Sequence, residues 1–358
     1  MKFLLVLTFV AVAFAKKFDG DQVLTLYPAE LAHVVAIHEL EEFADFWSPD
    51  SPSLVNVGTT VDVRIPRDHL LKTKQVLAEI KLNYDVKIHD VQEMINKQFD
   101  SVKTPYATDE QYYNTYHTIE EINAWQTDMV NTYPNLISQE VAGASFENRP
   151  ISRLTMGKSK DNPIFLIDCG IHAREWISPA FCQCFVNRML TKYGVDAGVT
   201  AMMDSLTFVI FPVLNVDGYA YSWTDDRMWR KTRSNYGTIC FGVDPNRNFD
   251  AAWSGPGSSS NPCSETYYGP SMASEPLTKT LQSYVKTNYQ KIKAYVTFHS
   301  YGQVFIFPYS YANKDVPNKD EHNALAANAA AAIESVNRKK YTYGPGYEFH
   351  VSCRRWFG

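Results

Sequence analysis

The spacing of apolar positions in the N-terminal part of the chain alternates between the periods of strands and helices. Strand-like alternation occurs at 22–28, 53–58, 61–66 and 84–90. Apolar residues spaced three or four apart predict helices at 29–46, 67–80 and 91–99. The order strand, helix, strand, strand, helix, strand is typical of a small α+β sandwich of the ferredoxin-like kind.

A larger unit begins near residue 112, and its pattern is different. Apolar runs typical of buried strands occupy 163–170, 206–215 and 292–300. Helical periodicity covers 118–132, 177–193, 275–289 and 320–337. Strands that alternate with helices predict an α/β domain around a mixed, largely parallel sheet flanked by helices.

The N-terminal end and the charge restrict where the protein works. Residues 1–15, MKFLLVLTFVAVAFA, combine a lysine, an apolar run and a small-x-small end. This pattern is typical of a signal peptide, and the run is too short to span a bilayer. We therefore expect a secreted, extracellular protein without a membrane anchor, in which disulfides can form. The net charge of −5, without a dense basic block, argues against nucleic acid as a partner.

A polar segment at 99–111 separates the two units and reads as an exposed linker. Lys103 within it is a candidate site for a trypsin-like protease, because exposed polar segments are where proteases cut. A signal, a small unit without a catalytic cluster, a cleavable linker and a larger domain together predict a zymogen. The expected division is signal peptide 1–15, inhibitory prodomain 16–103 and catalytic domain 104–358.

Polar side chains follow the three apolar runs of the larger unit. His172 and Glu175 come after the first run, Asn215 and Asp217 after the second, and His299 after the third. In an open α/β sheet, ligands bind beyond the carboxyl ends of the strands. Two histidines and a carboxylate are a ligand set that suits catalytic zinc, with water in the fourth position.

Four motifs occur in a fixed order: HAREWISPA (172–180), MWRKTRS (228–234), DPNRNFD (244–250) and HSYGQ (299–303). Together with the N-terminal unit they closely resemble the secreted zinc carboxypeptidases of the pancreatic A/B type, from about Gln22 to Gly346. The resemblance implies a procarboxypeptidase that uses one Zn²⁺ to hydrolyse the C-terminal peptide bond of peptides and proteins. It also implies activation by a trypsin-like protease, and we expect a monomer.

The resemblance implies a role for each matching residue. His172, Glu175 and His299 match the three zinc ligands. Arg230 matches the catalytic arginine that faces the developing oxyanion, where a fixed guanidinium group is stabilising. An arginine also offers a bidentate fork for a free carboxylate. The residues that match substrate-binding groups are Asn246 and Arg247 at the terminal carboxylate, and Arg174 and Tyr301 along the cleft.

The resemblance further implies two disulfides, Cys240–Cys263 and Cys169–Cys182. The second of these resembles a bridge of the B-type members. Cys353 and Cys184 remain, and Cys184 is expected to be a small buried hydrophobe, because free cysteines are often interior. The motifs leave open whether the side-chain preference is of the A type or the B type.

After Gly346 the chain reads YEFHVSCRRWFG and departs from the family pattern. The family's further segment carries a mobile tyrosine, the specificity-pocket residue and a general-base glutamate, and no motif aligns Glu348 with that base. We therefore expect zinc binding to survive and hydrolysis to be lost or strongly impaired, since proton transfer is worth about 10²–10⁴-fold. We also expect poor folding.

The alternative to an active zymogen is a truncated product that binds zinc without turnover. A zinc amidohydrolase of another specificity is the weaker alternative, because Asn246 and Arg247 suit a free carboxylate.

Overall fold

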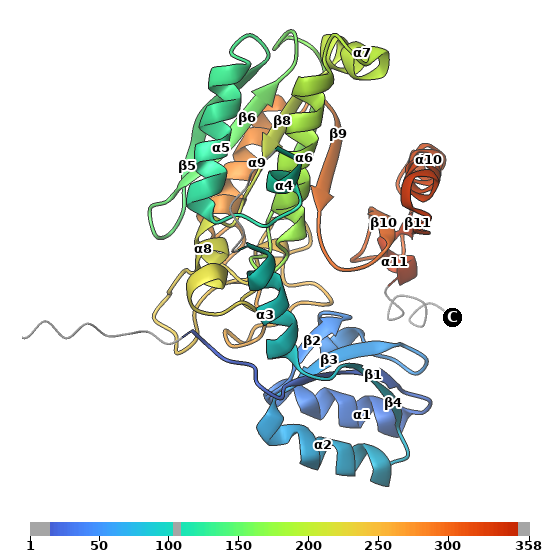
Figure 1. The fold of residues 1–358 in the computed structure, drawn as a ribbon. Helices are drawn as coiled ribbons and strands as arrows, with labels where there is room; N and C mark the ends of the chain where they lie inside the picture. Colours follow the sequence, from blue (N-terminus) through green and yellow to red (C-terminus); the bar gives the residue numbers. More distant parts are fainter. Residues whose placement is uncertain (1–14, 103–108, 350–358) are drawn as a thin grey trace, which may run out of the picture.

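The N-terminal domain is a four-stranded antiparallel sheet with two helices on its outer face (Figure 1). The computed structural model describes residues 15–102 and 109–349. The strand order is β2-β3-β1-β4. The elements are β1 (Gln22–Tyr27), α1 (Leu31–Glu39), β2 (Asp45–Ser48), β3 (Val61–Ile65), α2 (Arg67–Glu79) and β4 (Asn83–Ile88). Leu24, Ile37, Val63 and Leu77 are buried between the sheet and the helices. The predicted ferredoxin-like order is therefore confirmed.

The position of the second strand differs from the prediction. It is formed by residues 45–48, within the segment expected to be helical, and α1 already ends at Glu39. Residues 53–58 are not a strand, because Ser53 and Leu54 belong to a short 3₁₀ turn (Pro52–Leu54) and the residues after them continue as a loop. Proline has no N–H to give to a strand ladder. The apolar side chains of Leu54 and Val55, which suggested a strand, are buried although the residues lie outside any strand.

The larger domain is built on a five-stranded mixed sheet with the order β5-β6-β8-β7-β9 (Figure 1). Strands β8, β7 and β9 are parallel, and β5 and β6 are antiparallel to their neighbours. The three predicted strands are confirmed as β7 (Ile164–Cys169), β8 (Thr207–Phe211) and β9 (Ile292–Phe298). The hairpin of β5 (Ile137–Ala144) and β6 (Pro150–Met156) was not expected from the sequence.

Three of the four predicted helices flank this sheet, whereas α10 (Lys319–Asn337) packs with the C-terminal unit of the chain (Figure 1). The flanking helices are α5 (Ile119–Thr132), α6 (Ile177–Lys192) and α9 (Pro276–Asn288). Helix α5 begins with a capping box, in which the Thr118 hydroxyl and the Glu121 carboxylate each accept the other residue's backbone N–H. The shorter helices are α4 (Asp109–Tyr113), α7 (Ala197–Ser205) and α8 (Val216–Thr224).

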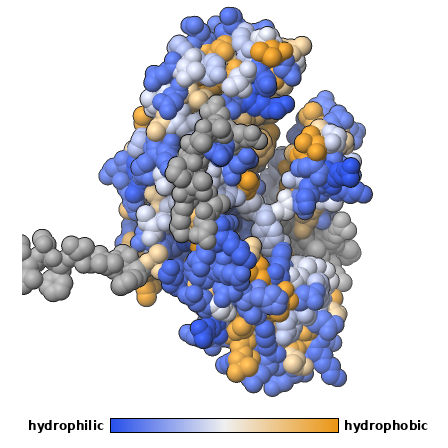
Figure 2. All heavy atoms as spheres, in the orientation of Figure 1, coloured by the Kyte–Doolittle hydropathy of each residue, from blue (hydrophilic) through white to orange (hydrophobic). Residues whose placement is uncertain are grey.

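Two further parts complete the chain. Helix α3 (Val91–Val102) leads from the N-terminal domain towards the linker, and Lys103 lies outside the described residues. A C-terminal unit of β10 (Val304–Phe307), β11 (Thr342–Pro345) and α11 (Gly346–Phe349) packs with α10. The space-filling view shows the N-terminal domain against the larger domain and an open hollow beside the C-terminal unit (Figure 2).

Candidate active site

The predicted zinc ligands meet at one edge of the sheet because β7 and β9 are parallel neighbours. His172 and Glu175 lie in the turn between β7 and α6, and His299 directly follows β9. The turn starts at Gly170, whose φ is +65° and where an added Cβ would lie 3.0 Å from Pro179. Glycine therefore suits the position that directs both side chains towards His299. The sequence prediction that these groups converge is confirmed.

The geometry of the cluster fits a zinc ion. The ligand atoms of His172, Glu175 and His299 lie within 4.8 Å of one another. The two Nδ1 atoms are 3.2 Å apart, and they lie 2.8 Å and 3.1 Å from the two Glu175 carboxylate oxygens. Zinc bonds of about 2.0–2.1 Å in a tetrahedral arrangement place ligand atoms at similar separations, about 3.3 Å. The chemistry and spacing of these donors thus suit one Zn²⁺.

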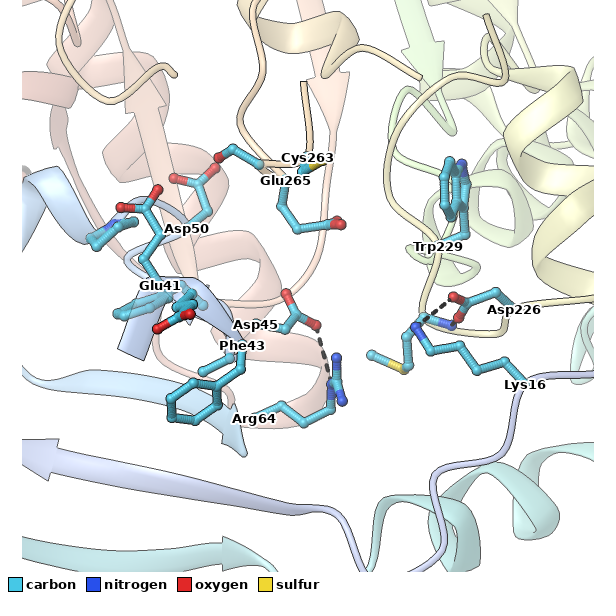
Figure 3. A pocket seen from close by; sticks show the side chains of 16 residues that line it. Lys16, Glu41, Phe43, Asp45, Asp50, Arg64, Asp226, Trp229, Cys263 and Glu265 are labelled. Atoms are coloured by element: carbon cyan, nitrogen blue, oxygen red, sulfur yellow. Dashed lines mark hydrogen bonds and ion pairs between the residues drawn. The ribbon is translucent and has the colours of Figure 1, made fainter. Parts of the chain in front are cut away.

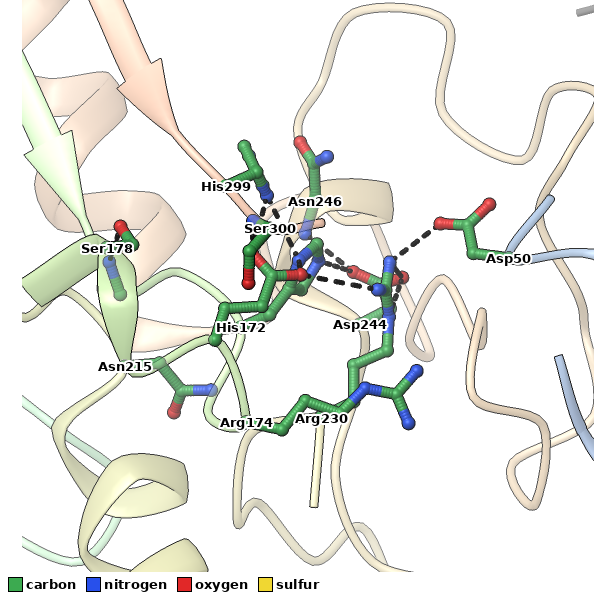
Figure 4. A network of polar contacts seen from close by, with 12 residues as sticks. Asp50, His172, Arg174, Ser178, Asn215, Arg230, Asp244, Asn246, His299 and Ser300 are labelled. Carbon is green, nitrogen blue, oxygen red and sulfur yellow. Dashed lines mark hydrogen bonds and ion pairs between the residues drawn. The ribbon is translucent and has the colours of Figure 1, made fainter. Parts of the chain in front are cut away.

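The charges in the cluster complement one another (Figure 4). Burial raises the pKa of Glu175, but the neighbouring His172 and His299 outweigh burial and hold this pKa well below the ordinary value. Burial lowers the pKa of His299, and the Glu175 carboxylate more than offsets this, so the net direction is upward. Glu175 is therefore a stable anion at neutral pH, as a zinc ligand must be.

Asp244 supports the cluster from behind, and sequence reasoning missed it. Its carboxylate is fully buried and accepts a hydrogen bond from His172 Nε2 at 3.1 Å. It also accepts from Arg230 Nε and Nη2 at 3.2 Å and 2.9 Å. Burial raises the pKa of Asp244, but Arg230 and His172 outweigh burial and keep it well below the ordinary value. The DPNRNFD motif contained this residue, yet only its contacts assign the supporting position.

Arg230 and Arg247 point at the same carboxylate, which belongs to the N-terminal domain. Asp50 Oδ2 accepts from Arg230 Nη2 at 2.8 Å and from Arg247 Nη2 at 2.7 Å. Arg230 Nη1 also lies 3.8 Å from Glu175. Because the same guanidinium group contacts both carboxylates, Asp50 lies beside the His172–Glu175–His299 cluster. Asn246 is exposed next to Arg247, and its backbone N–H is fixed by Asp244 (Figure 4).

The two other predicted cleft residues are also held by the N-terminal domain. Arg174 Nη1 donates to both carboxylate oxygens of Asp45, at 3.1 Å and 2.9 Å. The Tyr301 hydroxyl donates to Asp62 at 2.6 Å. The sequence analysis predicts an inhibitory prodomain, but it does not predict which of its residues contact the site, because an acidic residue carries no local signal of its distant partner.

Cavities remain between the described parts of the two domains. One, of about 220 Å³, is lined by Asp45, Arg64, Asp226 and Glu265 among others (Figure 3). Another, of about 260 Å³, is lined by Trp47, Arg174, Tyr301 and neighbouring residues. The N-terminal domain therefore covers the cleft without filling it completely.

The other expectations about single residues have mixed outcomes. The disulfides Cys169–Cys182 and Cys240–Cys263 are both present. Cys184 is exposed, so its expected burial is wrong. It lies two positions after buried Cys182 on α6, which turns it about 200° away from the buried face.

The polar residues after β8 do not join the zinc cluster. Asn215 caps helix α8 by accepting the backbone N–H of Gly218. Asp217 accepts hydrogen bonds from Ser145 and Arg149. Both residues are buried, and these contacts give them structural roles.

A mixed α/β sheet with a His–Glu–His cluster at the carboxyl edge of its parallel strands, covered by a second domain, defines a latent zinc hydrolase. The comparisons with known proteins support this class. The family model for zinc carboxypeptidase matches residues 122–355, and the model for the carboxypeptidase activation peptide matches residues 24–98. The chain therefore belongs to the zinc carboxypeptidase family and is a zymogen of the A/B type with one catalytic Zn²⁺.

Individual relatives agree with this assignment. Human carboxypeptidase B is 44% identical over 351 residues, which cover 96% of this chain and 84% of the relative. Mouse mast cell carboxypeptidase A is 38% identical over 332 residues, covering 92% and 79%. The crystal structure of thrombin activatable fibrinolysis inhibitor has a TM-score of 0.86 at 35% identity, covering 92% of this chain and 84% of that chain.

Proposed function

We propose that His172, Glu175 and His299 hold the catalytic zinc, and that Arg247 with Asn246 binds the free C-terminal carboxylate of a peptide. The observation that carries this proposal is the Asp50 carboxylate, which both Arg247 and Arg230 bind beside the cluster. A pair of guanidinium groups converging on one carboxylate is the recognition that an exopeptidase requires.

The remaining roles follow from the same geometry. When bound, zinc would polarise the carbonyl group of the scissile peptide bond and lower the pKa of a water molecule bound to it. Arg230 is fixed by Asp244 and faces the cluster, so its guanidinium group is placed to stabilise a developing oxyanion. Arg174 and Tyr301 orient the residues upstream of the scissile bond along the cavity that they line.

The prodomain keeps the enzyme latent by occupying these groups. Asp50 stands where the substrate carboxylate would bind, and Asp45 and Asp62 engage Arg174 and Tyr301. We infer that a trypsin-like protease cuts at Lys103 and releases the prodomain, residues 16–103, from the catalytic domain, residues 104–358. The three carboxylates then leave the cleft together.

Export and oligomeric state belong to the same proposal. Residues 1–15 act as a signal peptide, and the protein is secreted as a monomer. In the described part of the chain, no helix is both long and apolar enough to cross a membrane.

We further infer that hydrolysis by this chain is slow. Within residues 15–102 and 109–349, the carboxylates that contact the cluster or Arg230 are those of Glu175, Asp244 and Asp50. The first is a ligand, the second is paired, and the third leaves with the prodomain. Glu348 lies near Lys319, at 3.9 Å, rather than in the cluster. A dedicated general base is worth about 10²–10⁴-fold in rate.

The test of substrate recognition compares a peptide with a free C-terminus and the same peptide with an amidated C-terminus, after cleavage of the linker. The proposal expects release of single residues from the free peptide alone. Arg247→Ala should weaken this discrimination, whereas Arg188→Ala, on the surface of α6, should leave it unchanged. Equal hydrolysis of both peptides would refute carboxylate recognition and favour an amidohydrolase of another specificity.

A further inference from the structure

Asp168 is a fully buried carboxylate near the zinc cluster that has no place in the ligand set. It lies at the end of β7, directly opposite Thr297 on β9. Its two oxygens accept from two hydroxyl groups of β9, from Tyr295 at 2.5 Å and from Thr297 at 2.9 Å. A buried charge is costly unless it is paired in this way. Strand β9 therefore turns two side chains towards one carboxylate, and His299 directly follows the end of the strand.

The Thr297 hydroxyl also contacts the zinc ligand that follows it. Thr297 Oγ1 lies 3.3 Å from His299 Nε2. A hydroxyl group has one hydrogen to donate and lone pairs with which to accept. Because Thr297 donates its hydrogen to Asp168, its contact with His299 must be an accepted one. The proton of neutral His299 is then on Nε2, and the lone pair of Nδ1 faces Glu175 and His172.

The two histidines of the cluster are thus supported in parallel ways. His172 presents Nδ1 to the cluster and donates from Nε2 directly to Asp244. His299 presents Nδ1 and is linked to a carboxylate through one hydroxyl group. The His172 side chain is only 3% exposed, whereas that of His299 is 30% exposed. Packing fixes His299 less firmly, so its ring orientation depends more on this hydrogen bond.

We propose that Asp168 and Thr297 are positioning residues that fix the tautomer and ring orientation of His299 for metal binding. This proposal rests on the ligand set proposed above. Hydrogen-bond partners behind a ligating histidine raise metal affinity by about 10–100-fold. Thr297 is exposed, so water can partly replace it, and we expect an effect near 10-fold.

The test measures zinc affinity of the full-length apoprotein by competition with a chelator of known affinity. Thr297→Val removes the hydroxyl with little change in shape and keeps a β-branched residue on the strand. It should weaken zinc binding about 10-fold. Thr297→Ser keeps the hydroxyl and should restore the affinity to within about threefold. Thr191→Val is the matched control, because it makes the same change at an exposed threonine of α6 whose hydroxyl donates to the backbone carbonyl of Asn187, and its affinity should equal that of the wild type.

Two outcomes of the affinity measurement would overturn the proposal. One is wild-type zinc affinity in Thr297→Val, and the other is an equal loss in the valine and serine variants. Nitrogen NMR of the histidine rings provides a second measurement, which should find the proton of His299 on Nε2; a proton on Nδ1 refutes the proposal. A zinc affinity that His299→Ala leaves unchanged would instead refute the ligand set itself, and the positioning role with it.

Discussion

Replacing Asp50 by asparagine should loosen the prodomain without changing the metal site. Asp50 is the partner of Arg230 and Arg247, and the three side chains are 22%, 5% and 18% exposed. Asparagine keeps the size and one acceptor but loses the charge. Arg230 retains the charged partner Asp244, whereas the remaining contacts of Arg247 in the described residues are neutral oxygens, among them the Gly257 carbonyl and a weak contact to the Asn246 carbonyl.

The size of the effect follows from these contacts. A hydrogen bond to a charged group contributes about 1.5–3 kcal/mol when buried. Solvent reaches a fifth of Asp50, and Arg230 stays paired, so we expect about 2–3 kcal/mol in total for the lost charge rather than twice the single value. At about 1.4 kcal/mol per tenfold change, the cut prodomain should bind about 30–140-fold more weakly.

The assay follows dissociation of the prodomain fragment after the linker is cut. The dissociation constant is measured by titration between about pH 5 and pH 8, with Glu79→Gln as the control, because Glu79 is exposed at the end of α2. Burial raises the pKa of Asp50, but Arg247 and Arg230 outweigh burial and lower it overall. The contribution of Asp50 is therefore complete above the ordinary value of about 3.9 and is lost only as the pH falls through the lowered pKa.

The reasoning is wrong if Asp50→Asn binds within twofold of the wild type, or if Glu79→Gln weakens binding equally. It is also wrong if the difference in binding between the wild type and Asp50→Asn changes between about pH 7 and pH 5, because Asp50 stays ionised throughout that range. Zinc affinity of the variant serves as an internal check and should not change.

Three further predictions test the neighbouring contacts. Tyr301→Phe removes the hydrogen bond to Asp62 and should weaken prodomain binding about fivefold, at about 1 kcal/mol, as measured in the same titration; an unchanged constant would refute this anchor. Asp244→Asn should lower zinc affinity by about 10–100-fold in chelator competition, whereas Asp217→Asn, a buried aspartate bound to Arg149, should not; equal effects would point to general destabilisation. Replacing Cys169 and Cys182 together by alanine opens a loop with a sequence separation of 13 and should cost about 3 kcal/mol of unfolding free energy in denaturant titration; wild-type stability would contradict this.

The features that could be predicted from the sequence are those with a local pattern. Buried runs located β7, β8 and β9, and polar residues at their ends located His172, Glu175 and His299. Knowing where the strands end is enough to place these side chains together, because parallel strands bring their carboxyl ends to one edge of the sheet. The convergence of these three side chains at one edge of the sheet could therefore be predicted from the sequence.

The features that could not be predicted depend on partners far along the chain. Asp50 contacts Arg230 across 180 residues, and Asp45 contacts Arg174 across 129. Their segment, DFWSPD, contains no periodicity that points to a cleft. The same holds for the strand at 45–48, which forms because β3 offers it an edge. Nothing in its own pattern marks it as a strand.

The measurement that tests the central claim most directly follows zinc content and product release in one sample, after the linker is cut. The account predicts about one equivalent of zinc, slow release of single C-terminal residues, and loss of both activity and metal with a chelator. His172→Ala should lack both. Release that persists in chelator would contradict the zinc mechanism. One equivalent of zinc without any release would contradict the proposed hydrolysis and favour a product that binds zinc without turnover.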